Sequence, residues 1–136
     1  MRKTGEKWLK YLNTNDVYNF NLEFYRSIYS PRYFEKHRRA FDRMAHIGTA
    51  DECRRFEWLL DSMDKMDLLP RLCEIKCPCY VIASEKDETL GAEASLKMSQ
   101  ALGCECYIYP DGSHSVFDED RHYTKMLYEI EKSLKE

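Results

Sequence analysis

The chain has 136 residues, of which 43% are hydrophobic and 13% aromatic. This is enough for one compact domain with a core, and it excludes a collagen-like, low-complexity or disordered protein. Lysine and arginine total 21 against 24 aspartate and glutamate, which gives a net charge of −3. Because this balance offers no basic surface for phosphate backbones, we expect no nucleic-acid partner.

The amino-terminal segment and the cysteines indicate the cellular compartment. No apolar run approaches the ~20 residues that span a bilayer, and residues 1–13 lack the apolar stretch of a secretory signal. We therefore expect a cytoplasmic protein with no membrane partner. Because that compartment keeps thiols reduced, we expect free thiols and no structural disulfides among the six cysteines: Cys53, Cys73, Cys77, Cys79, Cys104 and Cys106.

Residues 1–66 have the spacing of consecutive helices joined by short turns. Apolar residues at three- and four-residue steps predict one buried helical face formed by Val17, Phe20, Phe24 and Ile28. Ser30 and Pro31 are suited to start the next helix, as N-cap and first helical residue. That helix ends near Gly48, and its buried stripe is expected to hold Phe34, His37, Phe41, Met44 and Ala45.

A further helix in this half starts with a capping box. Thr49 and Glu52 form the T-x-x-E pattern, in which each side chain satisfies a backbone N–H at the start of a helix. The buried face of this helix is predicted to be Cys53, Phe56, Leu60 and Met63.

The period changes after residue 67. The apolar run 79–83 predicts a strand that is covered on both faces of a parallel sheet. Residues 92–102 predict a helix that stops at Gly103, because Ser95, Met98 and Leu102 repeat at helical steps. Residues 104–109 alternate and predict a half-buried or edge strand. An amphipathic helix follows, with one apolar side made of Tyr123, Met126, Leu127, Ile130 and Leu134.

The order strand, helix, strand, helix indicates an α/β fold with a parallel pair and a right-handed crossover. Two parallel strands are too few for such a sheet, because parallel strands are normally buried on both faces and open edges invite further pairing. We therefore expect an incomplete core that is finished by a complementing segment or by a second copy of the chain.

Two loops follow the carboxyl ends of the predicted strands, where open α/β sheets build their sites. The loops are 84–88 and 111–115. Asp87 lies in the first and His114, 27 positions later, in the second. An acid beside a histidine orients the imidazole and stabilises its protonated form, which a hydrolytic general base requires.

The segment IKCPCYVIASEKDETLGAEASLKMSQALGCECYIYPDGSHSVFDE, residues 75–119, resembles the carboxyl-terminal end of an α/β-hydrolase. The helices of residues 30–75 are similar to the cap of enol-lactonase-like and meta-cleavage-product-hydrolase-like members. The resemblance implies a helical cap at 1–66 and a core segment of the hydrolase sheet at 67–136. It also implies that Asp87 is the acid and His114 the histidine of a catalytic triad.

The chain also departs from this family. Ser84 stands where many members have glycine, and Gly91 lies near a position that is often proline. No G-x-S-x-G nucleophile motif and no glycine-rich oxyanion loop occur in the sequence. On the family's plan these parts and the other core strands would precede residue 1. Because an acid–histidine pair cannot replace a nucleophile, we expect the chain alone to be inactive towards esters.

Each candidate residue also has a structural interpretation. Without the resemblance, Asp87 is a solvated turn residue and the segment 112–114 a surface turn. Glu85 is the fallback acid. Ser113 and Ser115 are adjacent to the histidine, which makes nucleophilic geometry improbable. Cys106 fits a small core residue better than a reactive thiol.

No metal or cofactor is expected. The pairs Cys77/Cys79 and Cys104/Cys106 would each lie on one face of a strand, but structural zinc sites use Cys-x₂₋₄-Cys on turns. The other histidines are interpreted as core-edge or surface residues: His37, His46 and His122. Many aromatic residues in 1–66 are expected to pack the helices, and some of them to line an apolar pocket.

These observations predict the carboxyl-terminal part of a serine-type α/β-hydrolase for small apolar esters, lactones or related carbonyl substrates. It would carry Asp87 and His114 without the nucleophile. The alternative is a non-catalytic hydrolase-like module that self-associates or binds a partner. A third interpretation is a split reading frame or a misassigned start codon.

Overall fold

The structure is a computed structural model that describes residues 3–135, apart from the side chains at positions 3, 4 and 64. The chain divides into two compact units, Met1–Met66 and Asp67–Glu136. The division coincides with the change of period in the sequence. That the units are a cap and a core segment of a hydrolase remains a prediction.

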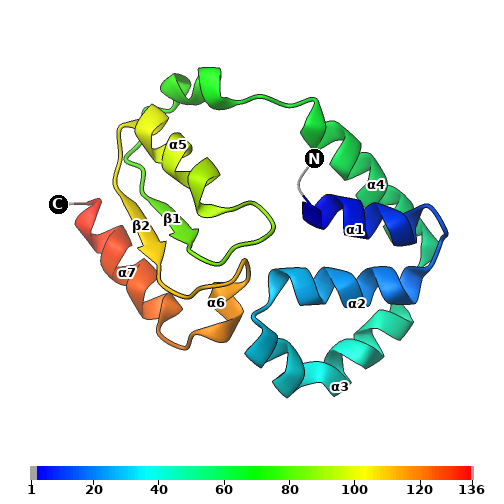
Figure 1. The fold of residues 1–136 in the computed structure, drawn as a ribbon. Coiled ribbons are helices and arrows are strands. Elements are labelled where there is room, and N and C mark those ends of the chain that lie inside the picture. The colour runs from blue at the N-terminus through cyan, green and yellow to red at the C-terminus, as the bar shows by residue number, and fades with distance from the viewer. Residues whose placement is uncertain (1–2, 136) are drawn as a thin grey trace. The chain divides into compact units, whose positions relative to one another are not determined.

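The first unit is helical throughout, as its spacing predicts. Figure 1 shows its helices in chain order: α1 (Lys3–Leu12), α2 (Val17–Ile28), α3 (Pro31–Ile47) and α4 (Ala50–Asp64). Helix α2 packs against α1 and α3, and α1 also packs against α4. The core cluster consists of Trp8, Phe20 and Cys53, surrounded by Tyr11, Leu12, Val17, Phe24, Phe56 and Leu60.

The helix starts of this unit follow the sequence signals. The Ser30 side chain accepts a hydrogen bond from the Tyr33 backbone N–H, and Pro31 occupies the first turn of α3. The capping box of α4 is confirmed, because Thr49 and Glu52 each satisfy the other's backbone N–H. The predicted buried faces need two corrections.

Met44 and Met63 were expected on buried faces but are 46% and 43% exposed. Met44 borders an open pocket of the unit instead of the core. Met63 lies in the last turn of α4, beyond the core cluster. A helical period predicts which side of a helix is apolar, but the packing of the neighbouring helices decides which residues on that side are buried.

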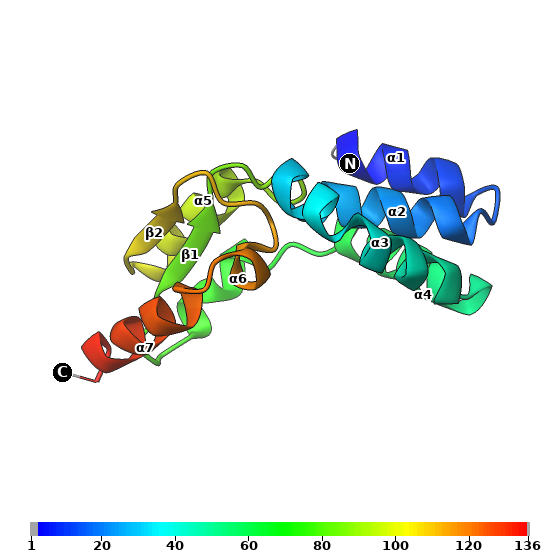
Figure 2. The same cartoon turned by 90° about the horizontal axis from the view of Figure 1, so that it is seen from below.

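The second unit contains a parallel strand pair, as predicted. Its elements are η1 (Leu69–Glu74), β1 (Val81–Ser84), α5 (Ala92–Leu102), β2 (Cys106–Tyr109), α6 (Val116–Glu119) and α7 (Tyr123–Ser133). Figures 1 and 2 show β1 and β2 side by side and running in the same direction. Val81 is paired with Cys106 and Ser84 with Tyr109. An α/β class with one small parallel sheet is therefore shown, in a chain that is mostly helical.

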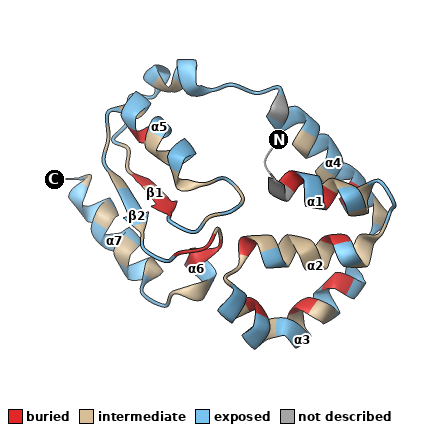
Figure 3. Ribbon diagram, viewed as in Figure 1, coloured by how far each residue is buried: buried red, intermediate tan, exposed pale blue. Residues whose placement is uncertain are grey.

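Both strands are shorter than predicted. Each begins two residues later, at Val81 and Cys106, and the pair is the whole of the sheet within residues 3–135. Strand β2 lacks the expected alternation, because Tyr107 and Ile108 are both exposed. Figure 3 shows that the buried residues of this unit gather on β1 and near the start of α6.

The apolar sides of the last helices are covered only in part. Met98 is 37% exposed, and Ser99 is the buried residue of α5. Leu127 is 41% exposed, and none of the described residues of α7 is fully buried. A two-stranded sheet offers little area for helices to cover, so their apolar faces remain open. None of the described helices has the length and apolar character needed to cross a bilayer.

Candidate active site

The structure brings the two predicted site residues together. Asp87 lies in the turn after β1, and His114 follows β2. The Nδ1 atom of His114 is 3.0 Å from Oδ2 of Asp87. The side chains are 31% and 12% exposed, respectively. Because an ionised carboxylate only accepts hydrogen bonds, Nδ1 carries the proton and donates a hydrogen bond to Asp87.

Asp87 is itself held by the backbone of its turn. Its Oδ1 atom accepts hydrogen bonds from the N–H groups of Thr89 at 2.8 Å and Leu90 at 2.9 Å. Burial works to raise the pKa of Asp87, but the hydrogen bonds from His114, Leu90 and Thr89 outweigh it and lower this pKa below its ordinary value. The carboxylate is therefore ionised at neutral pH and fixed in orientation.

Backbone and side-chain bonds join the two loops that carry the pair. The N–H of Glu85 donates to the carbonyl of Tyr109 at 3.0 Å, and that of Lys86 donates to the carbonyl of Gly112 at 2.9 Å. In return the N–H of Asp111 donates to Oε2 of Glu85 at 3.0 Å. The Lys86 ammonium also forms an ion pair with Asp111. These bonds hold the loops at the carboxyl ends of β1 and β2 in a fixed relation.

A close approach between the loops leaves little room for a side chain at position 112. A Cβ atom there would lie 3.1 Å from Oγ of Ser84 and 3.2 Å from Cγ2 of Val116. Ser84 is buried at the end of β1, and Val116 is buried at the start of α6. The preceding residue, Asp111, has a left-handed φ of 56°. The turn that leads to His114 therefore packs tightly against β1.

In the described part of the chain, the histidine ring is hydrogen-bonded to Asp87 and to none of the alternative site residues. Glu85, the fallback acid, accepts a hydrogen bond from the Asp111 backbone. The hydroxyl of Ser113 is buried and donates to Oε1 of Glu119 at 2.6 Å. Ser115 is 2% exposed. Ser113 and Ser115 are thus structural neighbours of His114, and we assign neither of them the role of nucleophile.

The second ring nitrogen of His114 remains available for chemistry. Within residues 3–135, the hydrogen bond from Nδ1 to Asp87 is the only one that this imidazole forms. With Nδ1 protonated, Nε2 is the basic nitrogen. Because the side chain is about one-third exposed, Nε2 can accept a proton from a hydroxyl or a water molecule.

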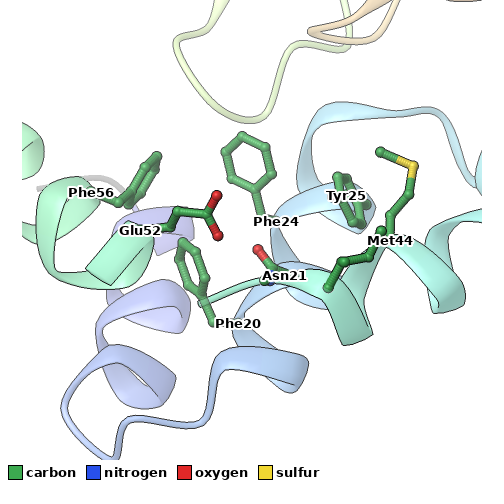
Figure 4. Close-up of a pocket in the computed structure, with 9 residues that line it drawn as sticks. Phe20, Asn21, Phe24, Tyr25, Met44, Glu52 and Phe56 are labelled. Atoms are coloured by element: carbon green, nitrogen blue, oxygen red, sulfur yellow. The ribbon is translucent and has the colours of Figure 1, made fainter. Parts of the chain in front are cut away.

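An aromatic pocket lies in the first unit, apart from these loops in the sequence. Its volume is about 320 Å³, and it is lined by Phe20, Asn21, Phe24, Tyr25, Met44, Ile47, Gly48, Glu52 and Phe56. Figure 4 shows the Glu52 carboxylate among the phenylalanine rings. Desolvation, and secondarily the charge of Glu52, raise the pKa of Tyr25. The pocket suits a small apolar group.

Two of the remaining histidines pack against tyrosine rings. The ring of His37 lies 4.3 Å from that of Tyr33, and the ring of His46 lies 4.4 Å from that of Tyr18. His122 is the residue before α7. Among the described residues, no group of three or more histidine, cysteine or acidic side chains has an arrangement that would hold a metal ion.

The sequence predicted that Asp87 and His114 lie near each other, but it did not indicate the residues that fix their loops. Glu85 was considered as an acid, and its role as the bridge to Asp111 was not predicted. Glu119 was not considered, and it binds Ser113 from the short helix α6. No periodicity signals such contacts, because they depend on how two loops meet.

No known family model matches the chain. No curated protein matches it either.

Proposed function

We propose that this chain supplies the acid and the general base of a serine-type α/β-hydrolase and that the nucleophile comes from another segment. In this proposal Nε2 of His114 takes the proton from a serine hydroxyl and later activates water. Asp87 holds the imidazole in the tautomer with Nδ1 protonated and stabilises its charged form. The hydrogen bond of 3.0 Å between Nδ1 and Oδ2 is the observation that carries the proposal.

The surroundings of the pair support this role. A hydrolytic base needs an oriented histidine with one free nitrogen, and an acid that stays ionised at neutral pH. Asp87 has a lowered pKa and two backbone donors on its other oxygen. A solvated turn aspartate, which was the structural alternative, would not have 12% exposure and three hydrogen bonds.

The substrate class follows from the resemblance. We propose small apolar esters, lactones or related carbonyl compounds.

Two measurements test the proposal. The 136-residue chain should hydrolyse an activated ester such as p-nitrophenyl butyrate no faster than its His114→Ala variant. The coding sequence that precedes residue 1, or a neighbouring gene, should encode a G-x-S-x-G motif. The polypeptide joined to that segment should hydrolyse the ester and should lose this activity with either His114→Ala or Asp87→Asn.

Three results would contradict the proposal. They are His114-dependent turnover by the chain alone, full activity of the joined polypeptide without His114, and the absence of any nucleophile motif in the adjoining coding sequence. The last of these favours the second candidate function.

The second candidate is a non-catalytic module that associates with itself or with a partner. The open apolar surface of the second unit favours it: Tyr107, Ile108, Phe117, Leu127 and Tyr128 are all more than one-third exposed. Unpaired edges of a parallel sheet also invite another strand. Sedimentation equilibrium should then give at least twice the chain mass of 16.3 kDa, and a well-folded monomer would contradict self-association.

A further inference from the structure

Three cysteines meet at the end of the strand pair opposite to His114. Cys77 and Cys79 precede β1, and Cys104 precedes β2. All three line one pocket of about 530 Å³, together with Ile75, Pro78, Tyr80, Leu102, Gly103, Glu105, Ser133 and Leu134. Since Asp87 and His114 follow the carboxyl ends of the strands, these thiols have no part in the proposed hydrolytic chemistry.

Two of these cysteines stand at equal distances from the start of the strand pair. Val81 is paired with Cys106, and Cys79 and Cys104 each lie two residues before that pair, outside β1 and β2. The Val81 N–H donates to the Glu105 carbonyl at 3.0 Å, which ties the two segments together just before the strands. Both cysteines line the same pocket, and paired strands lie about 4.8 Å apart, a separation within the Cα range of about 4.4–6.8 Å that a disulfide requires.

Local bonds fix both residues at this end of the sheet. The Cys104 N–H donates to the carbonyl of Ser99 at 3.1 Å, which anchors it to the last turn of α5. The Cys79 thiol points back along its own segment and donates to the carbonyl of Cys77 at 3.3 Å. Both side chains are partly exposed, so a small oxidant can reach them.

The electrostatics agree with this proximity. Desolvation, followed by the nearness of the Cys77 and Cys104 sulfurs, raises the pKa of Cys79. At neutral pH Cys79 is therefore mainly the thiol, which is the unreactive form. We expect oxidation to be slow at pH 7 and to accelerate as the pH rises.

We propose that Cys79 and Cys104 form a reversible dithiol oxidation site, which a peroxide converts to a disulfide between the starts of β1 and β2. One thiolate attacks a peroxide oxygen, the O–O bond breaks, and a sulfenic acid and water form. The second sulfur then attacks the sulfenic sulfur, the S–O bond breaks, and another water leaves. Two thiols lose two protons and two electrons, and hydrogen peroxide is reduced to two waters.

The remaining cysteines are less suited to this reaction. Cys53 is buried in the first unit, and Cys73 donates to its own helical turn, at the carbonyl of Pro70. Cys106 lies opposite Val81. Cys77 lines the same pocket but lies two residues before Cys79, and so farther from the start of β1. The competing product is accordingly a Cys77–Cys79 disulfide within one segment.

The experiment uses the reduced full chain and one equivalent of hydrogen peroxide at pH 8.5. Free thiols, counted after unfolding, should fall from the six of the reduced chain to four. Trypsin releases residues 77–86 and 98–121 as separate peptides, so a disulfide between them appears as one linked species in mass spectrometry under non-reducing conditions. A thiol reductant should restore both peptides.

Single variants identify the bonded pair within these peptides. Cys79→Ser and Cys104→Ser should abolish the linked species, whereas Cys77→Ser and Cys106→Ser should retain it. Cys73→Ser, which removes a thiol outside the pocket, is the matched control and should behave like the unmodified chain. Oxidation should also raise the urea midpoint of unfolding in every variant that keeps the link, because the bond constrains the unfolded chain.

Other patterns would overturn the inference. These are a disulfide within peptide 77–86, links between chains, a link that survives Cys79→Ser or Cys104→Ser, or thiol loss that includes Cys73. Oxidation of the chain in urea provides the last check, because a link that forms equally well without the fold does not depend on the strand register. None of these readouts depends on hydrolytic activity.

Discussion

Asp87 and His114 are joined by a hydrogen bond of 3.0 Å although 27 positions separate them in the chain. The two oxygens of Asp87 have different partners, since Oδ2 accepts from the histidine and Oδ1 accepts from two backbone N–H groups. The histidine therefore meets a carboxylate that its own turn already orients. This is the relationship from which the proposed base chemistry follows, and it leads to the first prediction.

Asp87→Asn should lower the free energy of unfolding by about 1–2 kcal/mol at pH 7, because it removes the charge from hydrogen bonds with His114 and the turn. The pKa of Asp87 is lowered in the folded chain. Its contribution to stability is therefore complete above the ordinary aspartate pKa of about 3.9 and is lost as the pH falls through the folded value.

The measurement is urea unfolding of both proteins between pH 7 and pH 3. The stability difference between them should shrink as the pH drops below about 4. Asp61→Asn, which removes an exposed carboxylate paired with Lys65, should change stability little at either pH. A difference for Asp87→Asn that stays constant over this range would contradict an ionised, bonded carboxylate.

Gly112→Ala should disturb the turn that carries His114. Its Cβ would lie 3.1 Å from the Ser84 hydroxyl and 3.3 Å from Ser84 Cβ, so a rotation of the hydroxyl alone would not relieve the contact. We expect a loss of about 1 kcal/mol in unfolding free energy and a shift of the His114 ring resonances in NMR spectra. Adding Ser84→Ala should recover part of both. Unchanged His114 ring resonances in Gly112→Ala would contradict this prediction, because they would show that the loop accommodates the methyl group without moving the histidine.

Thr49→Ala should remove one half of the capping box of α4. The Thr49 hydroxyl accepts from the Glu52 N–H at 3.3 Å, and substitution of such a residue by alanine costs about 1 kcal/mol. Thr49→Ser keeps the hydroxyl and is the matched control. Thermal unfolding followed by circular dichroism should place Thr49→Ser close to the unmodified chain. Equal losses in both variants would mean that the methyl group of Thr49 matters more than the cap.

Phe20→Ala should be the most damaging of these changes. Phe20 is 5% exposed and belongs to the core cluster with Trp8 and Cys53. Truncation of a buried phenylalanine costs about 3–5 kcal/mol. Trp58→Ala removes a larger side chain that is 63% exposed and should cost less than about 0.5 kcal/mol. Chemical denaturation of both variants decides the prediction, and similar losses would contradict the assignment of the core.

The helix boundaries of the first half could be predicted from local signals. Ser30 with Pro31 starts α3, and Thr49 with Glu52 starts α4, because caps act on backbone groups within one turn. Burial could not be predicted in the same way. Met44 was predicted on the same apolar stripe as Phe41 and Ala45, yet Phe41 and Ala45 are buried whereas Met44 borders an open pocket.

In the second half, too, a helix end could be predicted from nearby residues, whereas the lengths and exposed faces of the strands could not. Gly103 ends α5 in a left-handed conformation with φ of 65°, as its position predicts. The strands β1 and β2 are parallel as expected, but their lengths and exposed faces follow from the small sheet, which alternation within one strand cannot reveal. The dithiol site likewise depends on the register of two strands.

The sequence by itself determined the order of elements, most helix ends and the placement of Asp87 and His114 after two parallel strands, because each depends on the spacing of nearby residues. Only the tertiary structure decided that Asp87, and not Glu85, meets the histidine, and that Glu85 instead bridges to the Asp111 backbone. A hydrogen bond requires two groups within about 3 Å, and that distance between separate loops is set by the folded chain.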